Sequence, residues 1–149
     1  MDIHTPVPTI YGALLEKYEE TWTKQITELQ AKFGSVIEEV RLPRTFPTDV
    51  PIVYLKKEAT IAVLDFMRAA PGFEYDFLAD LTATDEEVNP RFEVVYQLLS
   101  LTNMARIRVK VRVPDGEEVP SVTPLWPAAN WPEREVWDMF GIKFTGHPH

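Results

Sequence analysis

Two neighbouring segments of this chain alternate so regularly between apolar and polar residues that they restrict it to folds containing a β-hairpin. They run from Arg91 to Leu101 and from Arg106 to Val113, with four residues between them. A period of two places successive side chains on opposite faces of a strand. We therefore predict two antiparallel strands joined through 102–105, with Leu101 opposite Arg106.

The two faces of this hairpin differ in character. In the predicted register one face is apolar and should lie in the core; it comprises Phe92, Val94, Tyr96, Leu98, Ile107, Val109, Val111 and Val113. The other face combines Val95, Leu99 and Leu101 with a basic row, namely Arg106, Arg108, Lys110 and Arg112. Two interpretations stay open. Either the long stems of the basic residues cover the apolar ones, or this face binds an acidic partner.

The remaining segments supply helices and further strands. Apolar residues at steps of three, four and seven predict one helix from about Thr9 to Gly34 and another from about Lys57 to Ala70. Strands are predicted over 36–42, over 50–55 and within 74–84. The resulting order, α-β-β-α-β-β-β and a short C-terminal helix, predicts a two-layer α+β fold with a mixed, mostly antiparallel sheet. We expect the second helix to place the strands on either side of it in parallel.

The last quarter of the chain is rich in tryptophan. Pro132 suits the first turn of a helix and Gly141 suits its end, which predicts a helix from about Pro132 to Phe140. So short a helix is not stable alone, and its aromatic side chains must pack on the core or on a partner. With 149 residues, we predict a single domain, in which residues 1–122 form the α+β core and 123–149 form an aromatic docking segment.

Charge and composition exclude several functions. A net charge of −8 argues against nucleic acid as a partner. The absence of cysteine excludes thiolate-bound iron–sulfur clusters. The three histidines, His4, His147 and His149, lie near the chain ends, which is more typical of flexible tails than of a buried metal site. Without a signal-peptide pattern or an apolar run of about 20 residues, we expect a soluble, intracellular protein with no direct membrane insertion.

Five carboxylates are the first candidates for acid–base catalysis: Asp80, Asp85, Glu133, Glu135 and Asp138. A small carboxylate-dependent hydrolase would need two of them facing each other across a cleft. The competing interpretation is structural, because Arg134 and Asp138 are spaced to pair on one helix, and Glu133 and Glu135 suit the positive end of its dipole. No phosphate-binding glycine loop or Gly-x-Ser-x-Gly elbow is present. We therefore predict no catalytic residue in this chain.

The most specific pattern is a long, ordered series of short motifs. Its C-terminal part is Asn130-Trp131, Glu133-Arg134-Glu135, Asp138-Met139-Phe140-Gly141-Ile142, Phe144 and Gly146-His147-Pro148. Upstream, the matching motifs are Phe77–Ala83, Arg91–Tyr96, Leu98–Ser100, Arg108, Lys110-Val111 and Pro120–Val122. The series resembles the NADH dehydrogenase 30-kilodalton subunit family of respiratory complex I, which includes the C subunit of bacterial NADH-quinone oxidoreductase.

The resemblance implies a non-redox structural subunit in the peripheral arm of a proton-pumping NADH:quinone oxidoreductase, at the cytoplasmic face of the bacterial inner membrane. Such a protein would brace the quinone module chiefly against the D subunit, with the B and I subunits nearby. NADH, FMN, iron–sulfur clusters and quinone would be bound by other subunits, so no cofactor or metal is expected here. The implied docking residues are Trp126, Asn130, Trp131, Glu133, Arg134, Glu135, Asp138, Phe140, Gly141, Gly146, His147 and Pro148.

Two features of this sequence depart from the family pattern. In the family the Gly-His-Pro run usually continues into a basic, hydrophobic tail, whereas this sequence stops at His149; docking through that tail is therefore no part of the expectation. Pro132 also stands where the family often has a residue with a backbone N–H, which a helix start tolerates. The alternative within the superfamily is the equivalent subunit of a membrane-bound hydrogenase or related dehydrogenase.

Overall fold

Apart from two short strands near the C-terminus, the order of helices and strands is the one that the sequence predicts. The computed structural model describes the backbone of residues 9–148 and the side chains of residues 16–148. Along the chain lie α1 (Thr9–Phe33), β1 (Ile37–Arg41), β2 (Ile52–Leu55), α2 (Thr60–Ala69), β3 (Phe77–Asp85), β4 (Phe92–Ser100), β5 (Ala105–Val113), β6 (Val119–Pro120), α3 (Asn130–Phe140) and β7 (Phe144–Thr145). Short 3-10 turns precede β1, α2 and α3; they are η1 (Gly34–Val36), η2 (Lys57–Ala59) and η3 (Pro127–Ala129).

The main sheet is mixed and mostly antiparallel, and its strand order is β1-β2-β5-β4-β3. Strands β2 and β5 form its parallel pair, and the other neighbours are antiparallel. The predicted α+β class is confirmed. Strands β2 and β3, which flank α2, run in the same direction as expected, although they are not neighbours in the sheet. Two long strands, β5 and β4, lie between them, and the parallel partner of β2 is β5.

The β4–β5 hairpin is shifted by two residues from the predicted register. Leu99 lies opposite Arg106, and the connection runs over 101–104. Asn103 closes this turn, since its side-chain amide donates to the Phe73 carbonyl at 3.0 Å and its backbone N–H donates to Ser100 Oγ at 3.1 Å. A shift of two residues leaves each side chain on its own face. The predicted core face is therefore confirmed, although the pairing is not.

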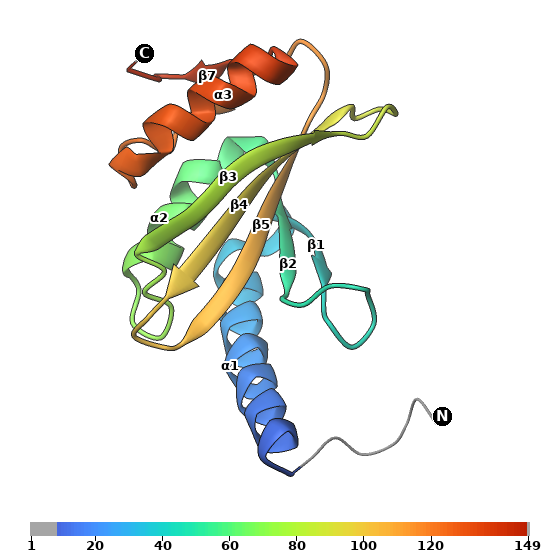
Figure 1. The fold of residues 1–149 in the computed structure, drawn as a ribbon, viewed down its shortest axis with the longest axis vertical. Coiled ribbons are helices and arrows are strands. Elements are labelled where there is room, and N and C mark those ends of the chain that lie inside the picture. The colour runs from blue at the N-terminus through green and yellow to red at the C-terminus, as the bar shows by residue number, and fades with distance from the viewer. Residues whose placement is uncertain (1–8, 149) are drawn as a thin grey trace.

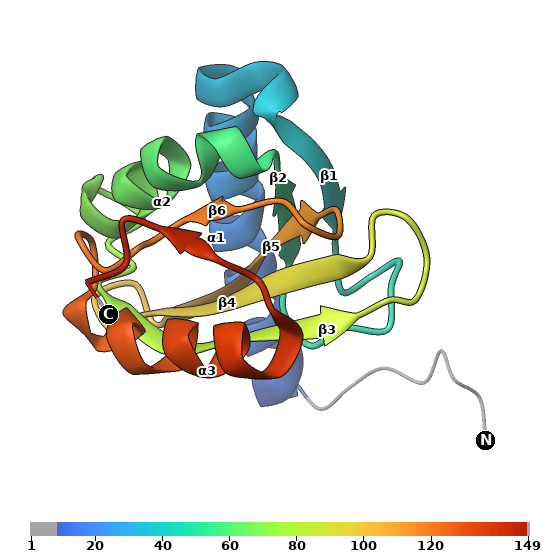
Figure 2. The same cartoon turned by 90° about the horizontal axis from the view of Figure 1, so that it is seen from above.

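Helices α1 and α2 cover one face of the sheet (Figures 1 and 2). From α1, Ile26 and Leu29 enter the core, which confirms that this helix has an apolar stripe; the side chains of residues 9–15 lie outside the described part. From α2 the core receives Val63, Leu64 and Met67. The opposite face of the sheet, called the open face below, carries no helix of this chain among the described residues. Within the same residues, no helix has the length and apolarity needed to cross a membrane.

The C-terminal segment completes the core instead of extending away from it. Strands β6 and β7 form a small parallel pair, and α3 lies along β3 (Figure 2). The buried side chains of residues 119–144 belong to the same core as those of the main sheet; they are Val119, Val122, Trp126, Ala129, Val136, Ile142 and Phe144. The sequence did not predict the β6–β7 pair, because strands of two residues have no readable periodicity.

We expect Leu64→Ala to lower the free energy of unfolding by about 2–5 kcal/mol, because it leaves a cavity in a fully buried part of α2. Leu101→Ala is the matched control, since the same truncation at this exposed position should change the value by no more than about 0.5 kcal/mol. Chemical denaturation of the isolated chain measures both. Equal losses would show that Leu64 is not in the core.

Candidate functional site

Helix α3 carries most of the residues implied in docking, and local chemistry determines both of its ends. It begins at Asn130, earlier than predicted, because η3 runs directly into it. Pro132 lies in the first turn, where its missing N–H has no intrahelical partner to lose. Gly141 ends the helix with a φ of 76°, and its N–H donates to the Trp137 carbonyl at 2.8 Å. This left-handed conformation suits glycine because it has no Cβ.

The inward face of α3 combines apolar packing with one carboxylate. Val136 is buried, and the Phe140 ring packs edge-on against Phe92 of β4, with ring centroids 6.0 Å apart. Glu133 is fully buried on the same helix. A buried carboxylate is destabilising unless donors satisfy its oxygens, so the neighbours of Glu133 determine what it does.

Those donors come from the segment that follows β6. Ser121 Oγ donates to Glu133 Oε1 at 2.6 Å, and the backbone N–H of Val122 donates to Oε2 at 2.8 Å. The N–H of Thr123 in turn donates to Ser121 Oγ at 3.2 Å. Both carboxylate oxygens are thereby occupied, and α3 is attached to residues 121–123 through one side chain.

The electrostatic setting of Glu133 is that of a partly compensated buried acid. Burial raises its pKa above the ordinary value of 4.5, while the hydrogen bonds from Ser121 and Val122 and the nearby His147 oppose the rise. Burial and then the negative charge of Glu133 raise the pKa of Tyr96. The Tyr96 hydroxyl is buried and has no hydrogen-bond partner among the described residues.

The Gly-His-Pro run packs against the start of α3, so the flexible tail expected at the chain end is wrong for His147. Its Nε2 lies 2.8 Å from the Asn130 carbonyl oxygen and 4.0 Å from Glu133 Oε1. Only 8% of its side chain is exposed. Its backbone N–H donates to the Phe144 carbonyl at 3.2 Å. His4 and His149 lie outside the described residues, within which no cluster of three or more metal-ligating side chains occurs.

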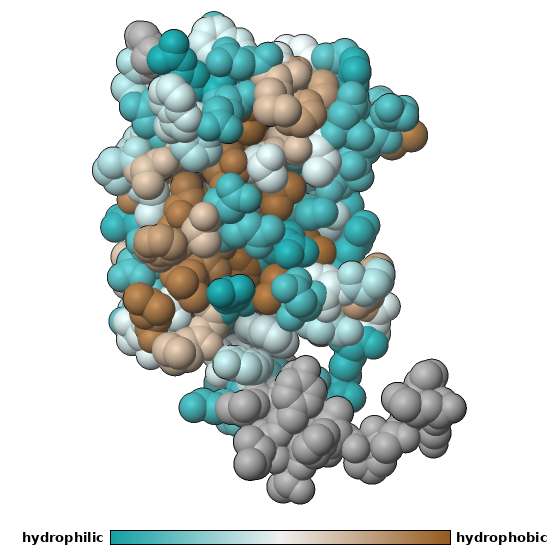
Figure 3. Space-filling model, in the orientation of Figure 1, coloured by the Kyte–Doolittle hydropathy of each residue, from teal (hydrophilic) through white to brown (hydrophobic). Residues whose placement is uncertain are grey.

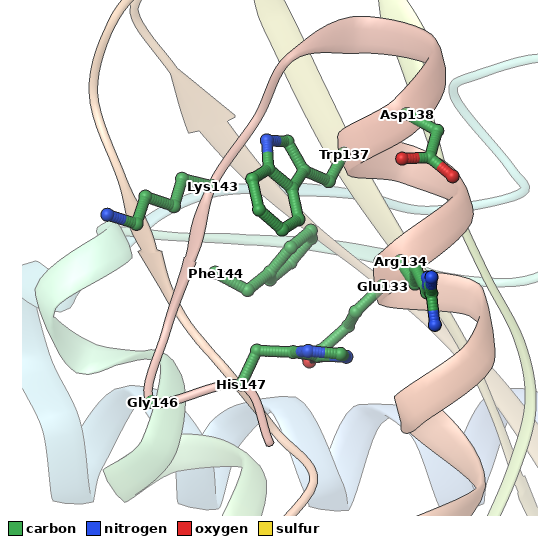
Figure 4. A pocket seen from close by; sticks show the side chains of 8 residues that line it. All are labelled: Glu133, Arg134, Trp137, Asp138, Lys143, Phe144, Gly146 and His147. Carbon is green, nitrogen blue, oxygen red and sulfur yellow. Dashed lines mark ion pairs between the residues drawn. The ribbon is translucent and has the colours of Figure 1, made fainter. Parts of the chain in front are cut away.

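A hollow of about 500 Å³ lies between α3 and the strand that follows it. Figure 4 shows Trp137 and Phe144 side by side in this hollow, with Glu133 directed toward His147. Lys143 lies at its border. The hollow is therefore partly aromatic, and the buried one of its two carboxylates, Glu133, is already bound to the chain itself.

The outward face of α3 exposes large apolar side chains. Trp131 is 66% exposed and Met139 is 75% exposed, whereas Trp137, although exposed, lines the hollow. The Arg134 guanidinium lies 5.9 Å from the centre of the Trp131 ring. The expected ion pair between Arg134 and Asp138 does not occur among the ion pairs of the described residues. The exposed side of α3 thus combines apolar surface with charged side chains, Arg134, Glu135 and Asp138, that form no ion pair among the described residues.

The implied docking residues fall into two groups. Trp126 and Glu133 are buried, and Phe140 and His147 are partly buried. The exposed group comprises Asn130, Trp131, Arg134, Glu135, Asp138, Gly141, Gly146 and Pro148. Docking by the exposed group stays a prediction, whereas the buried group keeps the segment in place from inside.

The catalytic candidates do not converge on one cleft. Asp85 pairs with Arg91 at 3.0 Å, and the hydrogen bond from Arg91 holds the pKa of that carboxyl below its ordinary range. Asp80 accepts a hydrogen bond from the backbone N–H of Leu81. Glu133 and Asp138 border the same hollow, but their side chains diverge there (Figure 4). Within the described residues the geometry gives the hydrolase hypothesis no support.

The basic row lies on the open face, and three of its members are paired inside the chain. The pairs are Arg108–Asp49 at 3.3 Å, Lys110–Glu93 at 3.2 Å and Arg112–Glu39 at 2.7 Å. Arg106 has no ion pair among the described residues. The guanidinium of Arg112 also lies 3.9 Å from the centre of the buried Tyr54 ring. Near β1 and β2, therefore, the interpretation in which basic stems cover apolar residues is the better one.

Glu39 is the acidic residue that sequence reasoning missed in this network. The hydrogen bonds from Arg41 and then Arg112 lower its pKa. Alternation alone places Glu93 on the same face as Lys110, and the register of β4 and β5 then brings the two side chains together. Nothing in the sequence places β1 near β5, because only the order of strands in the sheet does so.

With the geometry established, comparison with known proteins is informative. Residues 53–149 match the family described as the respiratory-chain NADH dehydrogenase, 30 Kd subunit. The chain is 40% identical over 121 residues to the second C subunit of NADH-quinone oxidoreductase from Rhizobium etli, covering 80% of this chain and 63% of that relative. It is 46% identical to the C subunit from Moorella thermoacetica, covering 72% of this chain and 76% of the relative. A Pseudomonas paraeruginosa relative, named as a C/D subunit, is 39% identical, and the match covers 83% of this chain and 22% of that protein.

Two solved structures share the fold. A trypsin-resistant fragment of Nqo5 superposes with a TM-score of 0.71 at 31% identity, covering 87% of this chain and 98% of the fragment. A chain of an archaeal membrane-bound sulfane sulfur reductase superposes with a TM-score of 0.69, covering 85% of this chain and 71% of that one. At 24% identity, the second likeness shows the fold alone.

The pKa of Glu133 leads to a testable pH dependence. Folded Glu133 binds its proton more tightly than the unfolded chain does, so ionisation favours unfolding. We expect the stability of the wild type, measured relative to Glu133→Gln, to be greatest below pH 4.5 and to fall as the pH rises through the folded pKa. The glutamine amide can keep both bonds, because it accepts from Val122 and donates to Ser121.

Denaturation of the two proteins at a series of pH values measures this difference. Glu135→Gln, exposed on the same helix, reports the general effect of removing a carboxylate. Glu133→Ala should lower the free energy of unfolding by about 1–3 kcal/mol for each donor left unsatisfied. A difference between wild type and Glu133→Gln that rises with pH would contradict the assigned pKa direction.

Proposed function

The chain belongs to the respiratory-chain NADH dehydrogenase 30 Kd subunit family, and on that premise we propose that it is a structural subunit of the peripheral arm of a proton-pumping NADH:quinone oxidoreductase. In this proposal it braces the quinone module against the D subunit, with the B and I subunits nearby. The chain itself catalyses no reaction.

The observation that carries the proposal is the agreement of sequence and fold over most of the chain. Relatives at 39–46% identity are named as C or C/D subunits of NADH-quinone oxidoreductase. In the Pseudomonas paraeruginosa relative the matching region is part of one longer protein, whose name joins C and D. A covalent junction of that kind supports the D subunit as the principal partner of this chain.

The chemistry of the chain agrees with a role in assembly. It contains no cysteine, so it has no thiolate with which to ligate an iron–sulfur cluster. Its buried carboxylate is bound to Ser121 and Val122. We propose that NADH, FMN, iron–sulfur clusters and quinone are bound by other subunits, and that this chain lies at the cytoplasmic face of the bacterial inner membrane through its partners.

The alternative is the equivalent subunit of a membrane-bound hydrogenase or related dehydrogenase. The fold occurs in a chain of a membrane-bound sulfane sulfur reductase, so the fold does not distinguish the two complexes. Sequence identity supports NADH-quinone oxidoreductase, because relatives named as its C subunits reach 46% identity to this chain.

The exposed side of α3 is the surface that we propose for docking in this assembly. Trp131 lies there largely uncovered by the described residues, and the Arg134 guanidinium lies beside its ring. Large aromatic residues and arginine are over-represented among residues whose loss weakens protein interfaces most. The internal bonds of Glu133 keep this helix in place, so the surface is formed before the partner binds.

We expect Trp131→Ala to weaken association with the complex by about 2 kcal/mol, because a buried tryptophan at an interface is a common hot spot. Recovery of a tagged chain with the other subunits, from cells that express it in place of the native copy, measures this. The free energy of unfolding of Trp131→Ala should differ from that of the wild type by no more than about 0.5 kcal/mol, since the Trp131 side chain is 66% exposed.

The control is Val88→Ala, at an apolar position of equal exposure in the turn between β3 and β4. It should leave recovery unchanged. Failure of the wild-type chain to co-purify with any NADH-quinone oxidoreductase subunit would refute the proposed function. Normal recovery of Trp131→Ala would refute only the docking role of α3.

A further inference from the structure

The open face of the sheet contains a groove at the end of the β4–β5 hairpin. Two hollows of about 310 and 480 Å³ share Asp49, Val50, Leu99 and Arg106 and so form one continuous depression. Figure 3 shows apolar side chains gathered over this lower part of the molecule. We call this depression, together with Leu101 and Met104 at its rim, the hairpin groove.

The rim of the hairpin groove exposes apolar side chains that the fold does not use. Leu101 is 65% exposed and Met104 is 63% exposed. Met104 has a φ of 49°, a backbone conformation that disfavours any residue with a Cβ and suits glycine. A methionine here is therefore unfavourable for the backbone, and its exposed side chain recovers little of that loss by burial. The stability of the isolated chain gives no reason for a large side chain at this position.

One wall of the hairpin groove belongs to α1, because Tyr18 and Trp22 line it. The Trp22 indole N–H of α1 donates to the Arg106 carbonyl at 3.2 Å, and the Tyr18 ring stacks on Trp22 with centroids 5.9 Å apart. On the other side, the bonds of Asn103 to Phe73 and Ser100 hold the hairpin turn. The groove is thus preformed, which lowers the entropic cost of binding.

The charge at the end of the hairpin groove near Leu101 and Met104 specifies one feature of the occupant; Asp80 lines only the smaller hollow at the other end. Arg106 is exposed and, unlike the other basic residues of its row, has no ion pair among the described residues. An arginine beside apolar surface is complementary to a carboxylate on a mainly apolar partner. The net charge of −8 disfavours a second copy of this chain as that partner, because the two copies would repel each other.

The hydrogen bonding of the sheet specifies a second feature of the occupant, namely its secondary structure. Strand β4 is paired with β5 along its whole length, and the Arg106 carbonyl of β5, which lies beyond the end of β2, accepts from Trp22, so this face offers no continuous row of backbone groups to another strand. An extended segment lying here would leave its own N–H and C=O groups without partners. A helix satisfies its backbone internally and presents an apolar stripe, as α1 and α2 do on the opposite face.

We propose that the hairpin groove binds an amphipathic helix of a neighbouring subunit. Its apolar stripe packs on Leu99, Leu101 and Met104, and one of its carboxylates pairs with Arg106. This rests on the proposed function, since it requires a partner protein in the complex, and it assigns a second docking surface separate from α3. With the helix bound, the sheet has helices on both faces.

A photo-crosslinking amino acid at Met104 tests the identity of the occupant in the intact complex. The matched control carries the crosslinker at Val88, which is 66% exposed, away from the hairpin groove. We expect position 104 to react with a peptide of another subunit that has apolar residues at helical spacing and an Asp or Glu. An adduct with a second copy of this chain, with lipid, or with nothing beyond the Val88 control overturns the proposal.

Two substitutions test the energetics by competition with untagged wild-type chain for incorporation into the complex. Met104→Gly should reduce incorporation by about fivefold while its free energy of unfolding stays equal or rises, so unfolding cannot explain the loss. Arg106→Glu should reduce incorporation at least as much, and Arg106→Lys should retain part of it. Val88→Gly controls for the loss of an exposed apolar side chain.

The outcomes separate the two proposals. Incorporation of wild type together with normal incorporation of Met104→Gly and Arg106→Glu refutes the hairpin groove and leaves the proposed function standing. If the wild-type chain does not join the complex, the proposed function fails, and the hairpin-groove proposal fails with it.

Discussion

The attachment of the C-terminal segment to the core depends on one buried carboxylate. Glu133 is fully buried, and its two oxygens accept from Ser121 and from the backbone of Val122. Removing either donor would leave a buried acceptor unsatisfied, which is more destabilising than the bond is stabilising. These bonds therefore determine how α3 is oriented on the sheet. With Glu133 directed inward, Trp131 lies on the exposed side of the helix.

The basic residues of the open face differ in their surroundings from one end of the sheet to the other. Toward β1 and β2, Arg112 and Lys110 pair with acidic residues and cover Tyr54, so this part is complete within the chain. Toward the hairpin turn, Arg106 is unpaired among the described residues and the apolar surface is uncovered. A face that is closed at one end and open at the other fits a subunit that another protein covers only in part.

Much of the fold could be predicted because its signals are local. The alternation within 92–100 and 105–113 identified the core face even though the predicted register was displaced, since a two-residue shift preserves the faces. Gly141 ended α3 as predicted because a left-handed φ is a property of one residue. The C-terminal site was predicted less well. Glu133 was assigned to helix start and docking, and its burial follows from contact with a segment eleven residues away.

The sequence by itself determined which segments are helices or strands, where helices end and which family the chain belongs to. Each of these is encoded in neighbouring residues or in an ordered series of motifs. Only the tertiary structure decided which charges are neutralised. Glu39 reaches Arg112 because β2 pairs in parallel with β5 and brings β1 close, a relation between segments that are 73 residues apart. Ion pairing requires proximity within a few ångströms, and proximity between distant segments is a property of the sheet order. For the same reason the basic row that looks uniform in sequence contains one arginine, Arg106, that differs from the others.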